Sequence, residues 1–326
     1  MKKLSIIIPC YNEAKSLNIL YNKFNEFSKQ SDISVEEEKI RPSDYEWELL
    51  FVNDGSKDNT LEVLQSLREK DNRVNFINLS RNFGKENAML AGMDYASGDA
   101  VIIMDADLQH PVEKIPEMIY WWQKGYSDVY GKRLNRKHEP WIRKHFSPLY
   151  YKMLQKATNL EITPNVGDFR LIDRQMLESL KQLRETQRYT KGLYSWVGYN
   201  KKEILYDTQD RASGKSSFNI RALINLAVDG ITGFTTAPLR LSMLIGFIVS
   251  FISIAYIIFI IFKTILYGET VQGFPTLMCV ILFLGGVQLI SIGIIGEYIG
   301  RIFNETKNRP TYIAESFNGD KISPKK

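Results

Sequence analysis

The chain has very few of the residues that form disulfides or metal clusters. It contains two cysteines, Cys10 and Cys279, and three histidines, His110, His138 and His145. Neither set has the spacing of a disulfide framework or of a metal-ligand cluster, and so few cysteines fit a reducing compartment. The sequence therefore excludes a disulfide-stapled protein and a zinc-cluster protein.

Strong positive charge and the common phosphate-binding glycine loops are also missing. The formal net charge is +5, and no run of Lys or Arg is long enough for a nucleic-acid arm. Neither a Walker-type Gly-Lys loop nor a Gly-x-Gly-x-x-Gly sequence occurs. We therefore expect no nucleic-acid partner, and neither a P-loop ATPase nor a Rossmann dehydrogenase.

The N-terminus resembles a signal peptide only superficially. Two lysines precede the apolar run 4–9, but the polar residues "YNE" at 11–13 follow almost at once. The run is too short for the apolar region of a signal peptide. It predicts a first β-strand and an N-terminal domain that is not exported.

Two long uncharged runs lie near the C-terminus. Residues 241–262 and 273–296 contain no Asp, Glu, Lys or Arg. Each run is long enough to cross a hydrocarbon core, which takes about 20 helical residues. The alternative is a pair of buried helices in a large globular core, but the runs lack helical periodicity and exceed the usual limit of roughly 18 apolar residues. We predict two transmembrane helices, at about 241–263 and 273–297.

The flanking charges predict how these helices are oriented. Basic residues lie before the first run and after the second, namely Arg221, Arg240, Arg301, Lys307 and Arg309. The positive-inside rule then places both termini in the cytoplasm and the short connector outside.

The predicted organisation therefore has four parts. They are a cytosolic domain over 1–218, a region 219–240, the two spans within 241–300 and a cytosolic tail over 301–326. Region 219–240 is either an amphipathic helix in the headgroup plane or an ordinary domain helix.

The cytosolic domain alternates between two patterns. Short apolar runs of strand type lie at 4–9, 47–54, 74–80 and 100–107, and segments with apolar residues at helical spacing lie at 14–30, 59–71 and 85–97. This alternation predicts an α/β fold with a doubly wound, mainly parallel sheet and helices on both faces. The charged insertion 31–46 is predicted to be a surface loop.

Polar residues follow each predicted strand. They are "YNE" at 11–13, "NDGSKD" at 53–58, "SRN" at 80–82 and the acidic pair Asp105 and Asp107. One such sequence is usually just a turn. Ligands of doubly wound sheets bind beyond the carboxyl ends of the strands, so several polar ends at one edge predict a ligand site there.

The stretch 102–111, "IIMDADLQHP", places two carboxylates one residue apart at the end of a buried strand. They repel each other and are costly to desolvate unless a cation neutralises them. Carboxylate and amide oxygens suit Mg²⁺ or Mn²⁺. In an extended segment Asp107 and Gln109 point to the same side and reach one ion, while Asp105 faces a bound nucleoside or a position beside the metal.

Four motifs follow one another along the N-terminal domain, namely "PCYNE", "VNDGSKDNT", "RNFGKENAML" and "DADLQHPVE". Together, and in this order, they resemble glycosyltransferase family 2. "VYGKR", "GDFRLIDRQ", "RASGKSSFN" and "DGITGFTTAPLRL" extend the resemblance over nearly the whole chain, to the branch of polyisoprenyl-phosphate glycosyltransferases. A lone Asp-x-Asp is weak evidence, whereas the ordered series is specific. The resemblance implies the GT-A version of the α/β fold.

The resemblance also implies a nucleotide-sugar site. The donor would be held by Pro9, Tyr11, Asn12, Glu13, Asp54, Arg81, Lys85 and Asp105. The metal, Mg²⁺ or Mn²⁺, would be held by Asp105, Asp107 and Gln109. The implied catalytic residues are Asp105, Asp107 and Asp168, of which Asp168 lies beside the sugar. As an alternative, Asp168 caps a helix or pairs with Arg170.

The same resemblance implies a site for a lipid phosphate. Its candidate residues are Arg133, Arg170, Arg211 and Lys215. In relatives the last of these loops reads R-x-x-G-x-S-K-aromatic, but here Ser217 stands where the Lys is usual. Whether Lys215 replaces that cation stays open, and an ordinary solvated surface charge is the alternative for Arg133.

The implied activity is that of a membrane-anchored, inverting glycosyltransferase. It would move a hexose from a UDP-sugar, UDP-glucose first and UDP-N-acetylglucosamine next, to undecaprenyl phosphate at the cytosolic face of the bacterial plasma membrane. Other expected partners are membrane lipids, further copies of the chain, a separate flippase and a downstream transferase that modifies a cell-surface polymer.

Two alternatives remain at this point. The first is the same chemistry with GDP-mannose or another donor, and the second is an inactive membrane-bound subunit that binds a nucleotide sugar. A processive polysaccharide synthase is not expected, because the Q-x-x-R-W motif of those enzymes is absent from the sequence.

Overall fold

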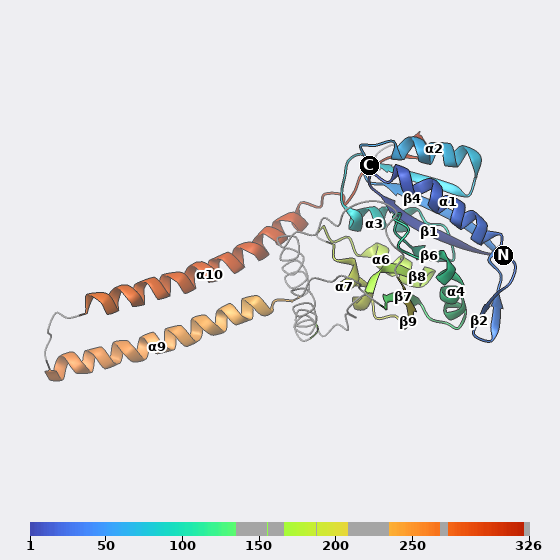
Figure 1. Ribbon diagram of the computed structural model, residues 1–326. Coiled ribbons are helices and arrows are strands. Elements are labelled where there is room, and N and C mark those ends of the chain that lie inside the picture. Colours follow the sequence, from blue (N-terminus) through green and yellow to red (C-terminus); the bar gives the residue numbers. More distant parts are fainter. Residues whose placement is uncertain (135–154, 156–165, 187, 208–234, 268–272, 323–326) are drawn as a thin grey trace. The chain divides into compact units, whose positions relative to one another are not determined.

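The computed structural model describes residues 1–134, 155, 166–186, 188–207, 235–267 and 273–322 (Figure 1). The chain divides into two compact units. The first contains Met1–Asn225 and Pro310–Lys326, and the second contains Leu226–Arg309.

The first unit is built on a nine-stranded mixed sheet. Its strands are β1 (Lys2–Cys10), β4 (Tyr45–Asn53), β5 (Val74–Leu79), β6 (Ala100–Ile103), β7 (Asp128–Arg133), β8 (Val166–Asp173), β9 (Lys201–Tyr206), β10 (Ala314–Phe317) and β11 (Asp320–Lys321). They lie in the order β11-β10-β5-β4-β1-β6-β8-β7-β9. The four strands predicted from the sequence form its parallel part, β5-β4-β1-β6.

Helices cover both faces of this sheet, as predicted. The side chains of Leu4, Ile6 and Ile8 on β1 join one core with α1 (Ala14–Ser28), α2 (Thr60–Lys70) and α4 (Ile115–Gln123). Residues of a strand alternate between faces, so Ile7 points the other way, toward α3 (Lys85–Tyr95). That contact is tight, because a Cβ on Gly92 of α3 would lie 2.3 Å from Ile7 Cγ2.

Beyond β6 the sheet changes direction. Strand β8 runs antiparallel to both β6 and β7, and β9 runs parallel to β7. Helices α6 (Arg174–Gln182) and α7 (Thr190–Trp196) follow β8 and precede β9. Strand β8 thus brings a second set of polar residues next to the strands whose ends were predicted to form the ligand site.

Two predictions about connecting segments need correction. The insertion 31–46 is not a plain loop, because β2 (Ile33–Val35) and β3 (Glu38–Ile40) pair as a hairpin before the short 3₁₀ helix η1 (Pro42–Asp44). The 301–326 segment is not wholly a separate tail, because strand β10 pairs antiparallel with β5. Its Asn318 Oδ1 also accepts a hydrogen bond from the Phe76 N–H at 2.8 Å.

The second unit contains two long helices, α9 (Ala237–Tyr267) and α10 (Phe274–Thr306). The segments Pro238–Tyr256 and Phe283–Thr306 are long and apolar enough to cross a membrane, and none of either segment is buried. Each predicted span falls within one helix, apart from Gly273, which lies just before α10. The predicted region 219–240 falls mostly outside the described residues, and Ala237–Arg240 already belong to α9.

Candidate active site

A cavity of about 400 Å³ lies at the carboxyl ends of β1, β4 and β6. Most of the residues predicted from the sequence to bind a donor line it, namely Pro9, Tyr11, Glu13, Asp54, Lys85 and Asp105, and so does Asp107, which was predicted to bind the metal. Cys10, Asn82, Gly84, Ala88 and Ala106 complete the lining. The structure therefore brings together the polar ends that the sequence analysis predicted to converge.

Asn12 and Asp54 shape the loops around this cavity. Asn12 has a left-handed backbone (φ 57°), and its Oδ1 accepts a hydrogen bond from the Lys57 N–H at 2.8 Å. The Asp54 carboxylate is only 3% exposed and accepts hydrogen bonds from the N–H groups of Phe83 (2.7 Å) and Gly84 (2.9 Å). Asn12 and Asp54, which were both predicted to bind the nucleotide-sugar donor, thus hold neighbouring loops together.

The loop held by Asp54 also contains Arg81. Arg81 is exposed, and its guanidinium carbon lies 4.6 Å from the centre of the Phe83 ring. Arg81 is not among the residues that line the cavity. Its predicted contact with the base or pyrophosphate stays a prediction.

Lys85, the first residue of α3, connects two carboxylates. Its Nζ lies 2.6 Å from Asp105 Oδ1 and 2.7 Å from Asp168 Oδ2. Burial by itself would raise the pKa of Asp168, but the positive charges of Lys85, Lys191 and Arg170 together outweigh burial and hold that pKa well below its usual range. The pKa of Asp105 is lowered in the same way, against the effect of burial. Both groups are therefore ionised at neutral pH.

The segment after β6 is not extended, contrary to the prediction. Strand β6 ends at Ile103, and the chain turns at Ala106 and Asp107. Leu108, which is only 7% exposed, takes a left-handed backbone (φ 65°), a conformation that is strained for a branched side chain. The Gln109 N–H donates to Asp107 Oδ1 at 3.1 Å. Asp107 and Gln109 are therefore related by a turn and not by strand alternation.

The oxygen atoms around this turn fit a divalent cation. Asp105, Asp107 and Glu13 line the same cavity, and burial followed by the charges of Asp107 and Asp105 raises the pKa of Glu13. Among the described residues, no group of three His, Cys, Asp or Glu side chains is placed to hold a metal alone. Mg²⁺ commonly binds protein through one or two carboxylates plus substrate phosphates, so this donor set fits it.

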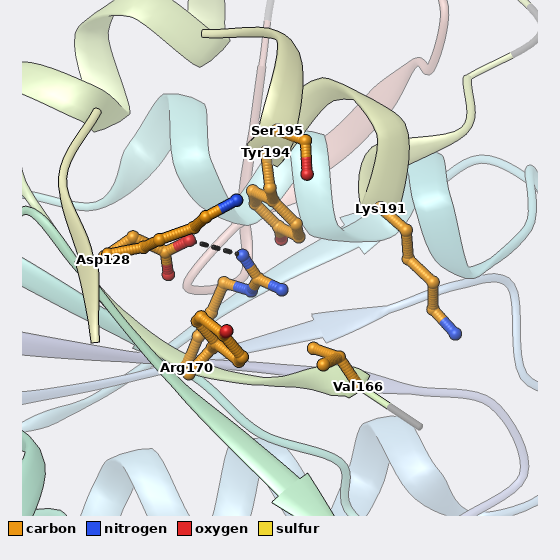
Figure 2. A pocket seen from close by; sticks show the side chains of 8 residues that line it. Asp128, Val166, Arg170, Lys191, Tyr194 and Ser195 are labelled. Atoms are coloured by element: carbon orange, nitrogen blue, oxygen red, sulfur yellow. Dashed lines mark hydrogen bonds and ion pairs between the residues drawn. The ribbon is translucent and has the colours of Figure 1, made fainter. Parts of the chain in front are cut away.

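Arg170 is not an exposed phosphate ligand, contrary to the prediction. It is 3% exposed, and its Nη1 donates to Asp128 Oδ2 at 2.9 Å. Its guanidinium carbon lies 3.5 Å from the centre of the Tyr194 ring (Figure 2). Asp168 therefore pairs with Lys85, and Arg170 pairs with Asp128, which also rules out the alternative of an Asp168–Arg170 pair.

The pocket drawn in Figure 2 is small. It has a volume of about 30 Å³ and is lined by Asp128, Arg170, Lys191 and Tyr194 among others. This volume and its polar lining fit one or two water molecules.

Arg133 is better placed to meet a phosphate. It lies at the end of β7, is partly exposed, and its Nε donates to the Tyr206 hydroxyl at 3.1 Å. The Tyr206 hydroxyl holds the Arg133 guanidinium in place. A freely solvated surface arginine would lack such a partner. Arg211 and Lys215, the other two predicted contacts, lie outside the described residues.

The sequence analysis missed two groups beside the site, of which one is buried and the other is partly buried. His110 is 3% exposed, and its Nδ1 accepts a hydrogen bond from the Asp105 N–H at 2.9 Å; burial lowers the pKa of this histidine. Glu86 accepts hydrogen bonds from both the N–H and the hydroxyl of Thr190 at the start of α7. The sequence did offer a signal for each residue. His110 directly follows the acidic motif, and Glu86 directly follows Lys85.

Two family profiles match the chain. Residues 5–181 match the family described as Glycosyl transferase family 2, and residues 237–302 match the family described as GtrB C-terminal hairpin. The first match covers the strands that carry the cavity through α6, and the second covers α9 and most of α10.

Named relatives are similar over nearly their whole length. An uncharacterized glycosyltransferase of Synechocystis is 44% identical over 322 residues, which cover 99% of this chain and 98% of that protein. The bactoprenol glucosyl transferase of Shigella phage SfX is 43% identical, covering 96% and 99%. A prophage bactoprenol glucosyl transferase homolog of Escherichia coli K12 is 42% identical, covering 95% and 98%.

Proposed function

This chain belongs to glycosyl transferase family 2 and is a glycosyltransferase, and we propose that its acceptor is a polyprenyl phosphate and its donor a UDP-hexose. The relatives named bactoprenol glucosyl transferase support this assignment, because they match both the sheet domain and the C-terminal hairpin. Undecaprenyl phosphate is the proposed acceptor. UDP-glucose is the first donor to test and UDP-N-acetylglucosamine the second.

One observation of the site carries the proposal. Lys85 joins Asp105, on the donor side of the cavity, to Asp168 on β8, the strand that also pairs with β7 and so leads to Arg133. Donor-side carboxylates and an acceptor-side guanidinium thus belong to one connected set of residues. Such a set suits a reaction that brings two phosphate-bearing substrates together.

A divalent cation, Mg²⁺ or Mn²⁺, would be held by Asp105, Asp107 and Gln109 beside the donor pyrophosphate. When bound, it supplies Lewis-acid stabilisation of the negative charge on the leaving diphosphate. Lys85 lies 2.6 Å from Asp105 and adds a second positive charge at the same place.

The acceptor needs no strong base. The second pKa of a phosphate monoester is near 6, so at cytosolic pH this nucleophile is largely a dianion. The residues must therefore hold two anions together and orient them. Arg133 would contact the acceptor phosphate, with Arg211 and Lys215 as further proposed contacts.

Asp168 has a role that follows from its ionisation. Its lowered pKa makes it a poor proton donor at neutral pH. As an anion beside the sugar it would accept a hydrogen bond from a sugar hydroxyl or stabilise positive charge that develops on the ring. Attack from the opposite side of the sugar would invert its configuration.

The apolar hairpin fits a lipid substrate. Helices α9 and α10 would anchor the enzyme in the plasma membrane with both termini cytoplasmic, as the flanking basic residues predict. The domain limits at 218 and 240, association with further copies, and a separate flippase and downstream transferase are parts of the same proposal.

The test uses the purified full chain. It is incubated with undecaprenyl phosphate, Mg²⁺ and a panel of labelled UDP- and GDP-sugars, and label is counted in the lipid phase. Transfer from one donor that is lost with a chelator and in Asp107→Ala supports the proposal. Nucleotide binding without transfer from any donor would favour an inactive binding subunit instead.

A further inference from the structure

Three buried rings form a cluster directly behind the site. His110 stacks on Phe169 with ring centres 4.8 Å apart and an interplanar angle of 13°. Tyr206 meets both rings edge-on, at 6.0 Å from His110 and 5.4 Å from Phe169. The three residues come from the turn after β6, from β8 and from β9, and none is more than 3% exposed.

Each ring is joined to a residue of the proposed reaction. His110 Nδ1 accepts the hydrogen bond of the Asp105 N–H at 2.9 Å. Phe169 directly follows Asp168 and points to the opposite face of β8. The Tyr206 hydroxyl accepts a hydrogen bond from Arg133 Nε at 3.1 Å. The cluster therefore connects to the donor side through His110 and to the acceptor side through Tyr206, and Phe169 packs against both of these rings.

The backbone of β7 leaves room for this cluster. A Cβ added to Gly131 would lie 2.7 Å from Tyr206 Cε1 and 2.9 Å from Phe169 Cδ1, closer than real contacts allow. Only glycine at this position lets the two rings pack against β7. Gly131 lies two residues before Arg133, so the same short strand accommodates the rings and presents the guanidinium.

We propose that His110, Phe169 and Tyr206 form a positioning unit that fixes the donor-side carboxylates relative to the acceptor-side Arg133. His110 positions the main chain of Asp105, and Tyr206 positions the guanidinium of Arg133. The packed rings give the two hydrogen-bonding groups fixed positions relative to each other, because close-packed side chains leave little freedom to shift. This inference rests on the proposed function for the roles of Asp105 and Arg133.

Two substitutions keep the rings and each remove one hydrogen bond. Tyr206→Phe removes only the hydroxyl that holds Arg133. His110→Phe retains a ring on Phe169 but removes the acceptor that holds Asp105. His110→Asn is the rescue variant, because its side-chain oxygen can accept from the Asp105 N–H in place of Nδ1.

The full chain in detergent is assayed with labelled UDP-glucose and undecaprenyl phosphate, or with whichever donor of the panel it uses. One lost hydrogen bond corresponds to roughly a three- to tenfold change. We expect Tyr206→Phe to raise KM for undecaprenyl phosphate by about that factor and to leave KM for the donor within about twofold.

His110→Phe should act on the other substrate. We expect it to weaken UDP binding, measured by calorimetry with and without Mg²⁺, by about three- to tenfold, and His110→Asn to restore most of it. Unfolding midpoints of all variants are measured alongside, because lost packing alone would lower the midpoint without separating the two substrates.

The outcomes separate this inference from the proposed function. Equal changes in both KM values, or a lowered unfolding midpoint with neither substrate affected, would overturn the positioning unit. If the wild-type chain transfers no sugar, the proposed function fails, while the UDP-binding arm still decides the role of His110. If His110→Phe binds UDP like the wild type, the inference fails even where transfer is observed.

Discussion

The ammonium group of Lys85 lies 2.7 Å from Asp168 Oδ2, so an ion pair joins the first turn of α3 to strand β8. The same ammonium lies 2.6 Å from Asp105 Oδ1. Two carboxylates that would repel each other, one from the turn after β6 and one from β8, are thereby held by one cation. Lys85 thus occupies the centre of the proposed site.

Replacement of Lys85 by Gln should reduce kcat/KM by about 10² to 10³, the range found when one preorganised charge or donor is lost from a reaction site. Asp105 and Asp168 would then repel each other without compensation, and the donor diphosphate would lose a cation. The measurement is steady-state transfer with the preferred donor. Lys39→Gln is the matched control, since Lys39 is an exposed partner of Asp32 in the β2–β3 hairpin. A loss below threefold for Lys85→Gln would contradict the assignment.

The pH dependence follows from the lowered pKa of Asp168. A carboxyl whose folded pKa lies below its unfolded value of about 3.9 stabilises the fold above that value. The stabilisation is lost as pH falls through the lower folded pKa. We therefore expect thermal unfolding of the wild type to show this loss only below about pH 4, and Asp168→Asn to lack that part of the acid dependence.

The catalytic rate provides a second test of the ionised state of Asp168. Asp168→Asn should lower kcat by about 10² or more, because the amide keeps the shape but not the charge. UDP affinity should stay within about twofold, since Lys85 and Asp105 remain in place. An acid limb near neutral pH in the wild-type rate that disappears in Asp168→Asn would show that the carboxyl titrates during the reaction, contrary to this view.

Arg170 and Asp128 offer a test of the corrected role of Arg170. Their side chains are each 4% exposed, and removing one partner of such a buried pair costs about 3–5 kcal/mol. Arg170→Met should therefore lower the unfolding midpoint by roughly 10 °C, and the double variant with Asp128→Asn should recover part of that loss.

Acceptor kinetics distinguish this structural role from phosphate binding. The folded fraction of Arg170→Met should keep its KM for undecaprenyl phosphate, whereas Arg133→Gln should raise it without a large change in the unfolding midpoint. A raised KM in a stable Arg170→Met protein would restore the original prediction for this residue.

The parallel part of the fold was predictable because its signals are local. Buried parallel strands appear as short apolar runs, and the polar residues that end β1, β4 and β6 follow them directly in sequence. The convergence of those ends then follows from topology alone. The cavity between them was therefore predicted without knowledge of any side-chain contact.

The parts that failed depend on contacts between distant segments. Nothing near Arg170 in the sequence shows that Asp128 will lie beside it, because β8 meets β7 only in the folded sheet. The left-handed backbone of Leu108, which turns the chain between Asp107 and Gln109, has no local cause such as glycine or asparagine. An alternation argument based on an extended chain therefore failed at that turn.

The C-terminal strand was missed for the same reason, and it leads to the last prediction. Asn318 has a left-handed backbone (φ 53°), and its side chain accepts from the Phe76 N–H and donates to Asn75 Oδ1 at 2.8 Å. Asn318→Ala loses both hydrogen bonds, so we expect the unfolding midpoint to fall by about 5 °C, and exposure of the β5 edge to promote aggregation.

A matched control separates these hydrogen bonds from backbone strain. Asn308 also has a left-handed backbone (φ 46°), but it follows α10 and lies outside the sheet. Asn308→Ala introduces the same strain without touching β5. If both alanine variants lower the midpoint equally, strain explains the effect. A larger loss for Asn318→Ala would indicate that the side-chain contacts of Asn318 with β5 stabilise the sheet domain beyond the effect of backbone strain.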